Sequence, residues 1–184
     1  ELKQRKIALG VTDFIVKAAA LALKEFQTVN SITDGRQIWW RSKINIGLAV
    51  DLKDALVVPV IRNADRLSMT ELHDYAAALI QKARNGKLGP DDMAGGTFTI
   101  SNMGMMNVEN FTAIINPGES AILAVSSAIE KPVARKGQVI IRPMMKMTLS
   151  SDHRLVDGAM AARFINRMKD MLEDIELWKN LTLS

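Results

Sequence analysis

The chain is organised around a stretch in which a strand gives way to a helix, Ser151-Asp152-His153-Arg154-Leu155-Val156-Asp157-Gly158. An apolar, β-prone run over residues 144–149 precedes it. After it, apolar residues recur at the spacing of a helix with one buried face, namely Ala161, Phe164, Ile165, Met168, Leu172 and Ile175. We therefore expect His153 where a strand ends and Asp157-Gly158 turns the chain into that helix.

His153, one of only two histidines in the chain, has two interpretations. Histidine is the side chain best suited to moving protons near neutral pH, and loops that follow strands commonly carry chemistry. A histidine taken in isolation is more often a structural residue that bonds to a backbone carbonyl. Asp157 also has two roles, because it can orient the site through a charge pair and can cap the last helix.

The composition is that of an ordinary globular domain. The 184 residues are 48% hydrophobic and 24% charged, which allows one sizeable core, and we expect one domain. The absence of cysteine excludes disulfides, thiolate nucleophiles and Cys-ligated metals. No apolar run approaches the about 20 residues that span a bilayer, and no signal peptide is visible. We expect no membrane span and no secretion.

The net charge of +4 favours anionic partners. The Lys and Arg residues are scattered, however, without a dense basic run, and aromatic residues are few. This pattern does not favour nucleic-acid binding. A small molecule that carries phosphate groups would suit the same charge.

Helices and strands are mixed along the chain. We expect a helix from Thr12, as its N-cap, to about residue 26, then a β-prone stretch at 38–40 and strands at 44–50 and 56–61. A helix follows from the Ser68–Glu71 capping box to Gly86, then strands at 97–101, 120–127 and 139–150 before the last helix. This order predicts an α/β (α+β) domain with a mixed sheet covered by helices.

Several local features carry expectations of their own. Pro59 inside the 56–61 strand indicates an edge or an irregularity, and Lys136-Gly137 predicts a hairpin turn. His73 falls on the polar flank of its helix, where we expect a solvated residue with no partner. Two methionine clusters favour flexible core packing, namely Met103, Met105 and Met106, and Met144, Met145 and Met147.

Ser101 is the best candidate for a catalytic hydroxyl. A histidine base needs a proton to take, and its reaction needs a partner for the negative charge that develops. Ser101 ends an expected strand and precedes Asn102-Met103-Gly104, where the backbone can turn tightly. Alone, this is a weak signal, since a serine at a strand end more often forms a turn.

Four segments carry a resemblance to a known family. Residues 152–158 resemble the DHRxxDG motif of the acyltransferase (E2) components of 2-oxo acid dehydrogenase complexes. A related H-x-x-x-D-G motif occurs in chloramphenicol acetyltransferases and peptide-synthetase condensation domains. Residues 95–104 resemble the family's GGTFTISNxG segment, 111–117 its FxxIINPP segment and 58–65 its TPVIRNAD segment. The motifs occur in the family's order, and the resemblance as a whole spans about residues 11–175.

The resemblance implies a mechanism of direct transfer between two thiols. His153 would act as general base on the thiol of coenzyme A, which attacks the thioester of an acylated dihydrolipoyl group. Ser101 would donate a hydrogen bond to the tetrahedral oxyanion, and Asp157 would help to hold the loop that presents His153. Neither an acyl-enzyme nor a metal is implied, and the residues that bind coenzyme A are not identified.

The resemblance also implies an architecture and a set of partners. The fold would be that of chloramphenicol acetyltransferase, assembled as homotrimers in which His153 of one subunit faces Ser101 of its neighbour. The trimers would build a cubic or dodecahedral core that works with lipoyl domains and with the E1 and E3 components. Residues 1–184, which begin without Met, would form one catalytic domain lacking part of its N-terminus, with lipoyl and subunit-binding domains outside this chain. The location would be the cytoplasm in a bacterium or archaeon and the mitochondrial matrix in a eukaryote.

The acyl group is less well specified than the reaction. The segment Ile100-Ser101-Asn102-Met103-Gly104 favours acetyl, with branched-chain acyl and then succinyl groups as alternatives. The sequence departs from the family's pattern at Gln27, Ala55, Met106-Asn107 and Ser126-Ser127. A free-standing acetyl-CoA-dependent transferase is disfavoured, because such enzymes carry His-His where this chain has Asp152-His153. A non-catalytic scaffold remains the third hypothesis.

Overall fold

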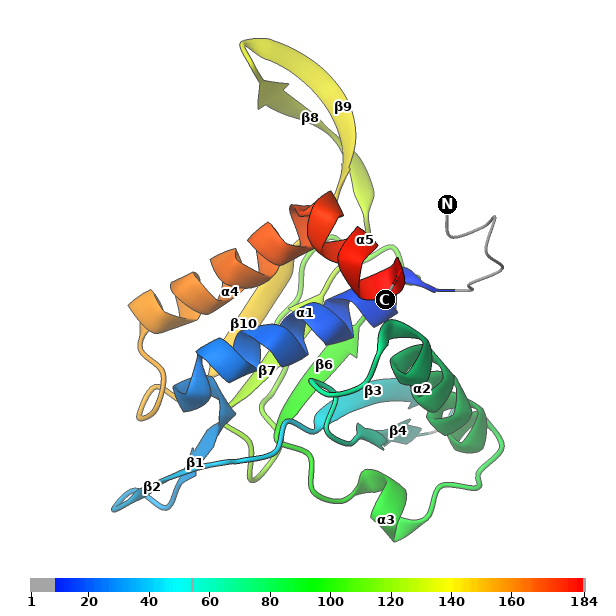
Figure 1. Ribbon diagram of the computed structural model, residues 1–184, viewed down its shortest axis with the longest axis vertical. Coiled ribbons are helices and arrows are strands. Elements are labelled where there is room, and N and C mark those ends of the chain that lie inside the picture. The colour runs from blue at the N-terminus through cyan, green and yellow to red at the C-terminus, as the bar shows by residue number, and fades with distance from the viewer. Residues whose placement is uncertain (1–8, 54, 184) are drawn as a thin grey trace.

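The structure, a computed structural model, describes residues 9–53 and 55–183 (Figure 1). The helices are α1 (Val11–Glu25), the 3₁₀ turn η1 (Gln27–Asn30), α2 (Met69–Arg84), α3 (Pro90–Met93), α4 (Gly158–Glu173) and α5 (Ile175–Leu183). The strands are β1 (Ser31–Thr33), β2 (Ile38–Trp40), β3 (Ile46–Leu52), β4 (Ala55–Val57), β5 (Val60–Ile61), β6 (Phe98–Asn102), β7 (Ala121–Val125), β8 (Ile129–Arg135), β9 (Gln138–Met144) and β10 (Met147–Ser151). The start of the chain, residues 1–8, on which the expectation of a missing N-terminal part rests, lies outside the described residues.

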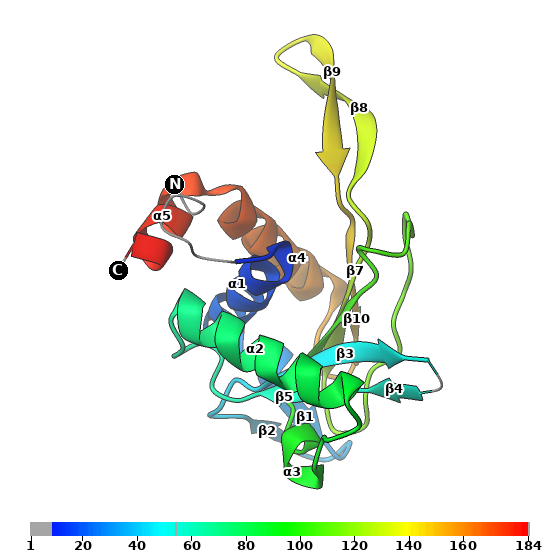
Figure 2. The ribbon, with the colours of Figure 1, turned by 90° about the vertical axis from the view of Figure 1, so that its right-hand side faces the viewer.

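A mixed sheet forms the centre of the fold, as the order of elements predicted. Its strand order is β10-β7-β6-β3-β4, and β5 also pairs with β3. Strands β3, β6 and β7 run parallel, while β10 is antiparallel to β7 and both β4 and β5 are antiparallel to β3. Helices α1, α2 and α4 lie together on one face of the sheet (Figures 1 and 2).

The core lies between this helical layer and the sheet. Every residue of β7 is buried, because the strand is flanked on both sides and covered by helices. Phe164 of α4 packs edge-on against Phe26 and at a tilt of 57° against Phe98 of β6, with ring centroids 5.8 Å apart in both pairs. Phe14 of α1 meets Trp178 of α5 at 5.0 Å. These aromatic contacts fix the last helices against α1 and the sheet.

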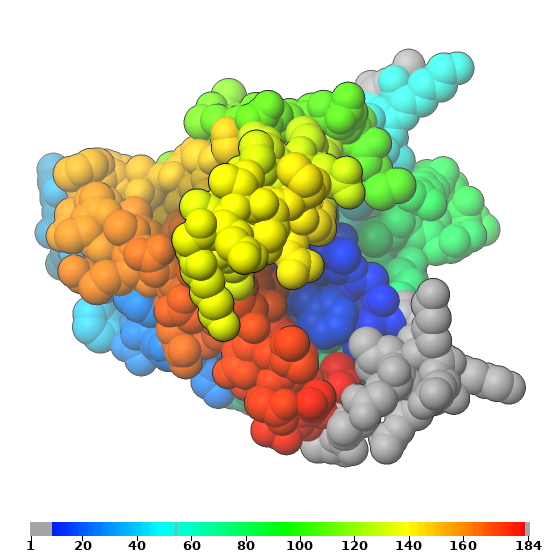
Figure 3. All heavy atoms as spheres, turned by 90° about the horizontal axis from the view of Figure 1, so that it is seen from above, coloured from blue at the N-terminus to red at the C-terminus, as the bar shows by residue number. Residues whose placement is uncertain are grey.

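The predicted strand 139–150 is two strands, so the single-strand expectation was wrong. The strand is interrupted between Met144 and Met147, where the backbone N–H of Lys146 donates to the hydroxyl of Ser126 at 2.8 Å. Strand β10 then joins the sheet, and β9 pairs with β8 in an arm that stands away from the domain (Figures 1 and 2). Seen from above, this arm (yellow) lies in front of the rest of the molecule (Figure 3). The arm contains Pro132 opposite Ile141 and Pro143 opposite Glu130.

The other turn predictions hold at the level of the backbone. Lys136 and Gly137 both have positive φ angles, 51° and 77°, and they form the two-residue turn of the arm. Pro59 lies between β4 and β5, so the expected single strand 56–61 is two short strands. The predicted irregularity at Pro59 is confirmed. The last helix also divides, because α4 ends at Glu173 and Ile175 starts α5 with 69% of its surface exposed.

The helix starts agree with the sequence at α2 but not at α1. At α2, the Ser68 hydroxyl accepts from the Glu71 N–H at 3.3 Å and the Glu71 carboxylate accepts from the Ser68 N–H at 2.8 Å, as predicted. At α1, the N-cap is Gly10 and not Thr12. Asp13 takes over the capping, since its Oδ2 accepts from the Gly10 N–H at 2.7 Å. Thr12 therefore lies inside the helix, with its hydroxyl available for another contact.

His73 has a partner, which corrects the expectation of a solvated residue. Its Nδ1 lies 2.8 Å from Oδ2 of Asp13, a buried carboxylate on α1. Local sequence patterns do not reveal this pair, because the partners lie on different helices, 60 positions apart. A buried carboxylate needs partners to offset its loss of hydration, and His73 with the Gly10 N–H supplies them. The pair ties α2 to the start of α1.

We predict that His73→Ala destabilises the fold by about 1–2 kcal/mol, because it removes a hydrogen bond to a buried charged group. Urea unfolding at a fixed protein concentration measures the loss. Asp74→Ala, at an exposed neighbouring position on the same helix, is the matched control and should leave the midpoint nearly unchanged. Equal midpoints for the two variants would show that the His73–Asp13 contact contributes nothing.

Candidate active site

His153 sits at the tip of a tight turn that its neighbours hold rigid. The Arg154 guanidinium folds back onto Asp152, with Nε 3.0 Å from Oδ1 and Nη2 2.6 Å from Oδ2. The Arg154 backbone N–H also donates to Asp152 Oδ1 at 3.0 Å. These hydrogen bonds hold the pKa of the Asp152 carboxyl below its ordinary value, so it stays charged and paired with Arg154. His153 itself is exposed.

The rest of the motif anchors this turn to the domain. Leu155 and Val156 are buried, and both of their backbone N–H groups donate to the carbonyl of Asp152 at 2.9 Å. Asp157 caps α4, since its Oδ1 accepts from the Met160 N–H at 2.7 Å, and this confirms the capping interpretation. Among the described residues no hydrogen bond or ion pair joins Asp157 to His153. Asp157 therefore fixes the end of the loop and does not contact the imidazole.

Ser101 lies on β6, one residue before the strand ends. Its backbone pairs with Ala49 of β3 on one side and Ala124 of β7 on the other. The side chain is half-buried, and no group in the described part of the chain hydrogen-bonds to its hydroxyl. Ser101 thus presents a hydroxyl that is available as a donor from a strand paired on both sides. This is the property that its predicted role as an oxyanion donor needs.

The loop after Ser101 explains one departure from the family's pattern. Asn107 stands where the family usually has glycine, and its φ is 55°, in the left-handed region that glycine favours. Asparagine tolerates this region better than most residues, so the substitution keeps the loop's course. Met105 is fully exposed and Met106 is 54% exposed. Neither packs into the core of the single chain, and Met144 is 42% exposed. Met145 and Met147, by contrast, are partly buried and pack against the core. The expectation of core packing is therefore confirmed for Met145 and Met147 and wrong for Met105, Met106 and Met144.

Within one chain, Ser101 and His153 lie toward opposite ends of the sheet. Ser101 pairs with Ala124 near the end of β7, whereas Ser151 pairs with Ala121 at its start. With about 3.3 Å per residue and about 4.8 Å between strands, the Cα atoms of Ser101 and Ser151 are roughly 14 Å apart. The chain then continues beyond Ser151, away from Ser101. The structure does not bring the two predicted catalytic residues together in one copy.

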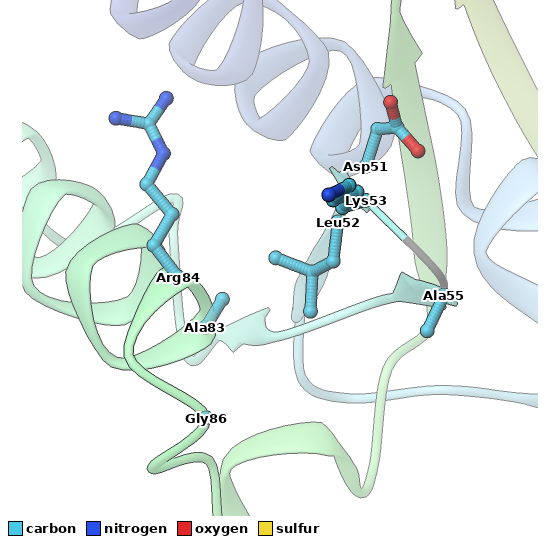
Figure 4. A pocket seen from close by; sticks show the side chains of 7 residues that line it. All are labelled: Asp51, Leu52, Lys53, Ala55, Ala83, Arg84 and Gly86. Atoms are coloured by element: carbon cyan, nitrogen blue, oxygen red, sulfur yellow. The ribbon is translucent and has the colours of Figure 1, made fainter.

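A first hollow lies between the end of α2 and the β3–β4 hairpin and has a volume of about 480 Å³. Figure 4 shows Ala83 and Arg84 on its helix side and Leu52 and Ala55 on its strand side. It contains neither Ser101 nor His153, so it is not the site that the sequence predicted.

A second hollow of about 390 Å³ lies next to the segments that lead into β6 and β7, at the end of the sheet where β10 finishes. Arg41 and Glu119 line it. Ser120, which follows Glu119 in the chain, accepts a hydrogen bond at its backbone carbonyl from the Asp152 N–H at 2.8 Å. The sequence analysis did not single out Glu119, whose only signal was its place just after the residue 111–117 segment. The hollow therefore adds an unforeseen polar cluster to the His153 end of the sheet.

Glu119 is a partly satisfied buried carboxyl group. Its Oε1 accepts from the Thr99 hydroxyl at 2.9 Å, and that hydroxyl accepts from the Asn116 amide at 2.9 Å. Its Oε2 is buried without a hydrogen-bond partner in the described part of the chain, as is Nε of Arg41. Burial raises the pKa of Glu119 above its ordinary value, although Thr99, Asn116 and Arg41 oppose the shift.

The described residues contain no cluster of three His, Asp or Glu side chains that could hold a metal ion. None of their helices is long and apolar enough to cross a membrane.

Residues 1–179 match the family described as 2-oxoacid dehydrogenases acyltransferase (catalytic domain). The chain belongs to this family. The resemblance seen in the four sequence motifs is thereby confirmed.

Curated members of this acyltransferase family are similar over most of the chain. The dihydrolipoyllysine-residue succinyltransferase component of the 2-oxoglutarate dehydrogenase complex of Pseudomonas aeruginosa is 47% identical over 174 residues, which are 95% of this chain and 42% of that protein. The mitochondrial acetyltransferase component of the pyruvate dehydrogenase complex of Schizosaccharomyces pombe is 45% identical over 170 residues, 90% of this chain and 35% of that protein. The chain thus spans less than half the length of these relatives.

Solved structures of acyltransferase cores share the fold. Dihydrolipoamide acetyltransferase of Azotobacter vinelandii matches with a TM-score of 0.89 and 42% identity, over 95% of this chain and 72% of that one. The cubic core of a pyruvate dehydrogenase multienzyme complex matches with a TM-score of 0.88 and 43% identity, with the same coverage. A chloramphenicol acetyltransferase matches at 0.56 and 16% identity, over 93% of this chain and 81% of that one. The predicted fold is confirmed.

We predict that Glu119→Gln makes the chain more stable relative to the native protein as the pH rises. Because the folded chain holds the Glu119 proton more tightly than the unfolded chain, native stability falls as the pH rises from the ordinary glutamate pKa of about 4.3 through the raised value. A neutral amide lacks this dependence. Thermal unfolding of both proteins between about pH 4 and about pH 8 tests it. A difference in midpoint that is constant with pH, or that grows toward acid, would contradict the prediction.

Proposed function

We propose that the chain transfers an acyl group between a dihydrolipoyl thiol and coenzyme A, as the catalytic core of a 2-oxo acid dehydrogenase complex. The observation that carries the proposal is the turn around His153, which holds an exposed imidazole between an Arg–carboxylate pair and two buried anchors. Such a turn fixes the position of a base without occupying its nitrogen atoms. Family membership supplies the reaction class.

The chemistry follows from the two side chains. His153 takes the proton of the coenzyme A thiol, whose pKa of about 8.5 needs only modest help from an imidazole. The thiolate attacks the thioester carbonyl, and the free hydroxyl of Ser101 donates to the oxyanion that forms. Collapse of the tetrahedral intermediate expels the dihydrolipoyl thiolate, which takes the proton back from His153. No acyl-enzyme and no metal enter the sequence of steps.

The Azotobacter vinelandii structure supports these assignments. It concerns the roles of a serine, a histidine and an asparagine in the catalytic mechanism of that enzyme. The three residues follow one another there at the same spacing along the chain as Ser101, His153 and Asp157. Asparagine and aspartate both offer a side-chain oxygen that can cap a helix, so Asp157 can serve the same positioning role.

We infer that a complete site forms between two copies of the chain. Ser101 and His153 of one copy lie too far apart to act on one carbonyl, because general bases and oxyanion donors act within about 3 Å of the reacting atoms. Exposed apolar strands on the chain fit burial in an assembly: Ile38, Trp39 and Trp40 on β2, and Val139 and Ile141 on β9. A trimer that builds a cubic or dodecahedral core meets both conditions.

The partners and the location follow from the same family. A core of this kind would receive acyl groups from lipoyl domains and work beside the E1 and E3 components. It would act in the cytoplasm of a bacterium or archaeon or in the mitochondrial matrix of a eukaryote.

For the acyl group we retain acetyl as the first candidate and now place succinyl second, ahead of branched-chain acyl groups. The amino-acid sequence of the segment around Ser101, residues 100–104, favoured acetyl. The similar curated relatives include a succinyltransferase of Pseudomonas aeruginosa as well as an acetyltransferase of Schizosaccharomyces pombe, at nearly equal identity. Overall similarity therefore does not separate these two acyl groups, and branched-chain acyl groups form the third arm of the test.

We predict His153-dependent transfer between dihydrolipoamide and one of acetyl-, succinyl- or isobutyryl-CoA. His153→Ala should abolish it, and Ser101→Ala should lower kcat by about 100- to 1000-fold, the usual loss of an oxyanion donor. Steady-state assays of the assembled protein measure both, with particle size as the control for assembly. Full activity of His153→Ala would exclude the mechanism, and no transfer with any of the three thioesters would favour a scaffold.

We also predict that the two inactive variants complement each other. When His153→Ala and Ser101→Ala chains are unfolded and reassembled together in equal amounts, about one quarter of the intersubunit sites regain both residues in a ring of subunits. Activity should recover to roughly that fraction of the native rate. Reassembly of each variant alone is the control. No recovery from a correctly assembled mixture would contradict a site that is shared between two subunits.

A further inference from the structure

Thr12 makes a contact that its place in α1 does not require. The sequence assigned its hydroxyl to capping, but Gly10 and Asp13 perform that task. The Thr12 Oγ1 instead accepts a hydrogen bond from Nδ2 of Asn102 at 3.1 Å. The two residues lie 90 positions apart, and Asn102 directly follows Ser101 on β6. The contact therefore joins the start of α1 to the strand end that carries the free serine hydroxyl.

Asn102 uses both ends of its amide. While Nδ2 donates to Thr12, Oδ1 accepts from the backbone N–H of Gly104 at 2.8 Å. The Met103 N–H donates to the carbonyl of Val125 at 2.9 Å, which ends the pairing with β7. Asn102 thus closes the turn that leads out of the sheet. A side chain that bridges a helix and a turn in this way sets the direction in which the strand ends.

The start of α1 is a firm support for this bridge. Asp13 ties it to α2 through His73 at 2.8 Å, and one turn further on the buried Lys17 donates to the carbonyls of Asp65 and Leu67 at 3.0 and 2.6 Å. Phe14 packs against Trp178. Helix α1 is therefore held on several sides near Thr12, whereas the residues just after Asn102 leave the ladder.

We propose that Thr12 and Asn102 are positioning residues that hold the Ser101 hydroxyl where it meets the oxyanion. The inference rests on the proposed role of Ser101. Ser101 is the last residue but one of β6, so its orientation depends on how the strand end is held. An oxyanion donor must lie within about 0.5 Å of its working position, and a misplacement of about 1 Å can lower the rate about 100-fold. The Thr12–Asn102 bridge supplies a restraint that the backbone ladder alone does not give.

The first test is Thr12→Val, which keeps the shape and β-branching of the side chain and removes only the hydroxyl. We expect kcat to fall by about tenfold and KM for each thiol substrate to change by less than about twofold, because only the interaction with the transition state is weakened. Thr12→Ser should restore kcat. Thr182→Val, which removes a threonine hydroxyl that bonds to the Trp178 carbonyl of α5, is the matched control and should leave kcat unchanged.

A double-mutant cycle separates positioning from general stability. In the Ser101→Ala background, Thr12→Val should cause no further loss of kcat, because no serine hydroxyl remains to be positioned. Asn102→Ala should lower kcat at least as much as Thr12→Val, because it also removes the contact with the Gly104 N–H. Adding Thr12→Val to Asn102→Ala should cause no further loss. Unfolding midpoints and particle sizes, recorded for every variant, exclude the effects of poor folding.

Each outcome decides the point. An unchanged kcat for Thr12→Val, or an equal loss with and without Ser101, overturns the inference and leaves the proposed function standing. Native activity of Ser101→Ala overturns the proposed oxyanion role first and the positioning role with it. A tenfold loss that vanishes without Ser101 establishes the bridge as part of the catalytic apparatus.

Discussion

The antiparallel pairing of β10 with β7 is the constraint on which the rest of the structure depends. The C-terminal ends of β3, β6 and β7 lie at one end of the sheet, and the C-terminal end of β10 lies at the opposite end. Ser101 and His153 both stand at strand ends, so this one reversal sends them in opposite directions. A chain that needs both residues at one carbonyl can satisfy the need only by meeting another copy of itself. In the proposed mechanism, the topology therefore couples the chemistry to assembly.

The two halves of the site are held in different ways. The histidine is carried by a short turn whose neighbours do the anchoring, with Leu155 and Val156 in the core and Asp157 at the start of α4. The serine is carried by a strand, and its restraint comes from pairing on both sides and from the Asn102 bridge. In the described part of the chain, neither the imidazole nor the serine hydroxyl has a hydrogen-bond partner, while residues beside each of them do. If the two groups act as the proposed base and donor, they are already in place for a substrate and need little reorganisation.

The sequence predicted those features that depend on local order. Helical spacing after Gly158, the Ser68–Glu71 capping box, the Lys136-Gly137 turn and the DHRxxDG motif all require only neighbouring residues to be read, and all are present. The failures involve partners distant in sequence. His73 looked solvated because Asp13 lies on another helix, and Thr12 looked like a cap because Asn102 lies 90 positions away. The split of the 139–150 strand was missed because an apolar run does not reveal which part pairs with β7 and which with β8. The separation of Ser101 from His153 likewise follows from strand direction, which apolar periodicity does not encode.

The β8–β9 arm has two open edges, and an open edge can recruit further strands without limit. Pro132 and Pro143 occupy alternate pairing positions of the same kind, at which the backbone N–H would point outward from the ladder. Each edge of the arm therefore lacks one donor that an incoming strand would need. An exposed apolar ribbon is normally a hazard while a newly made chain waits for its neighbours. Here the two prolines, one on each edge, make the ribbon a poor template for fibrous growth and leave its side chains free for specific association.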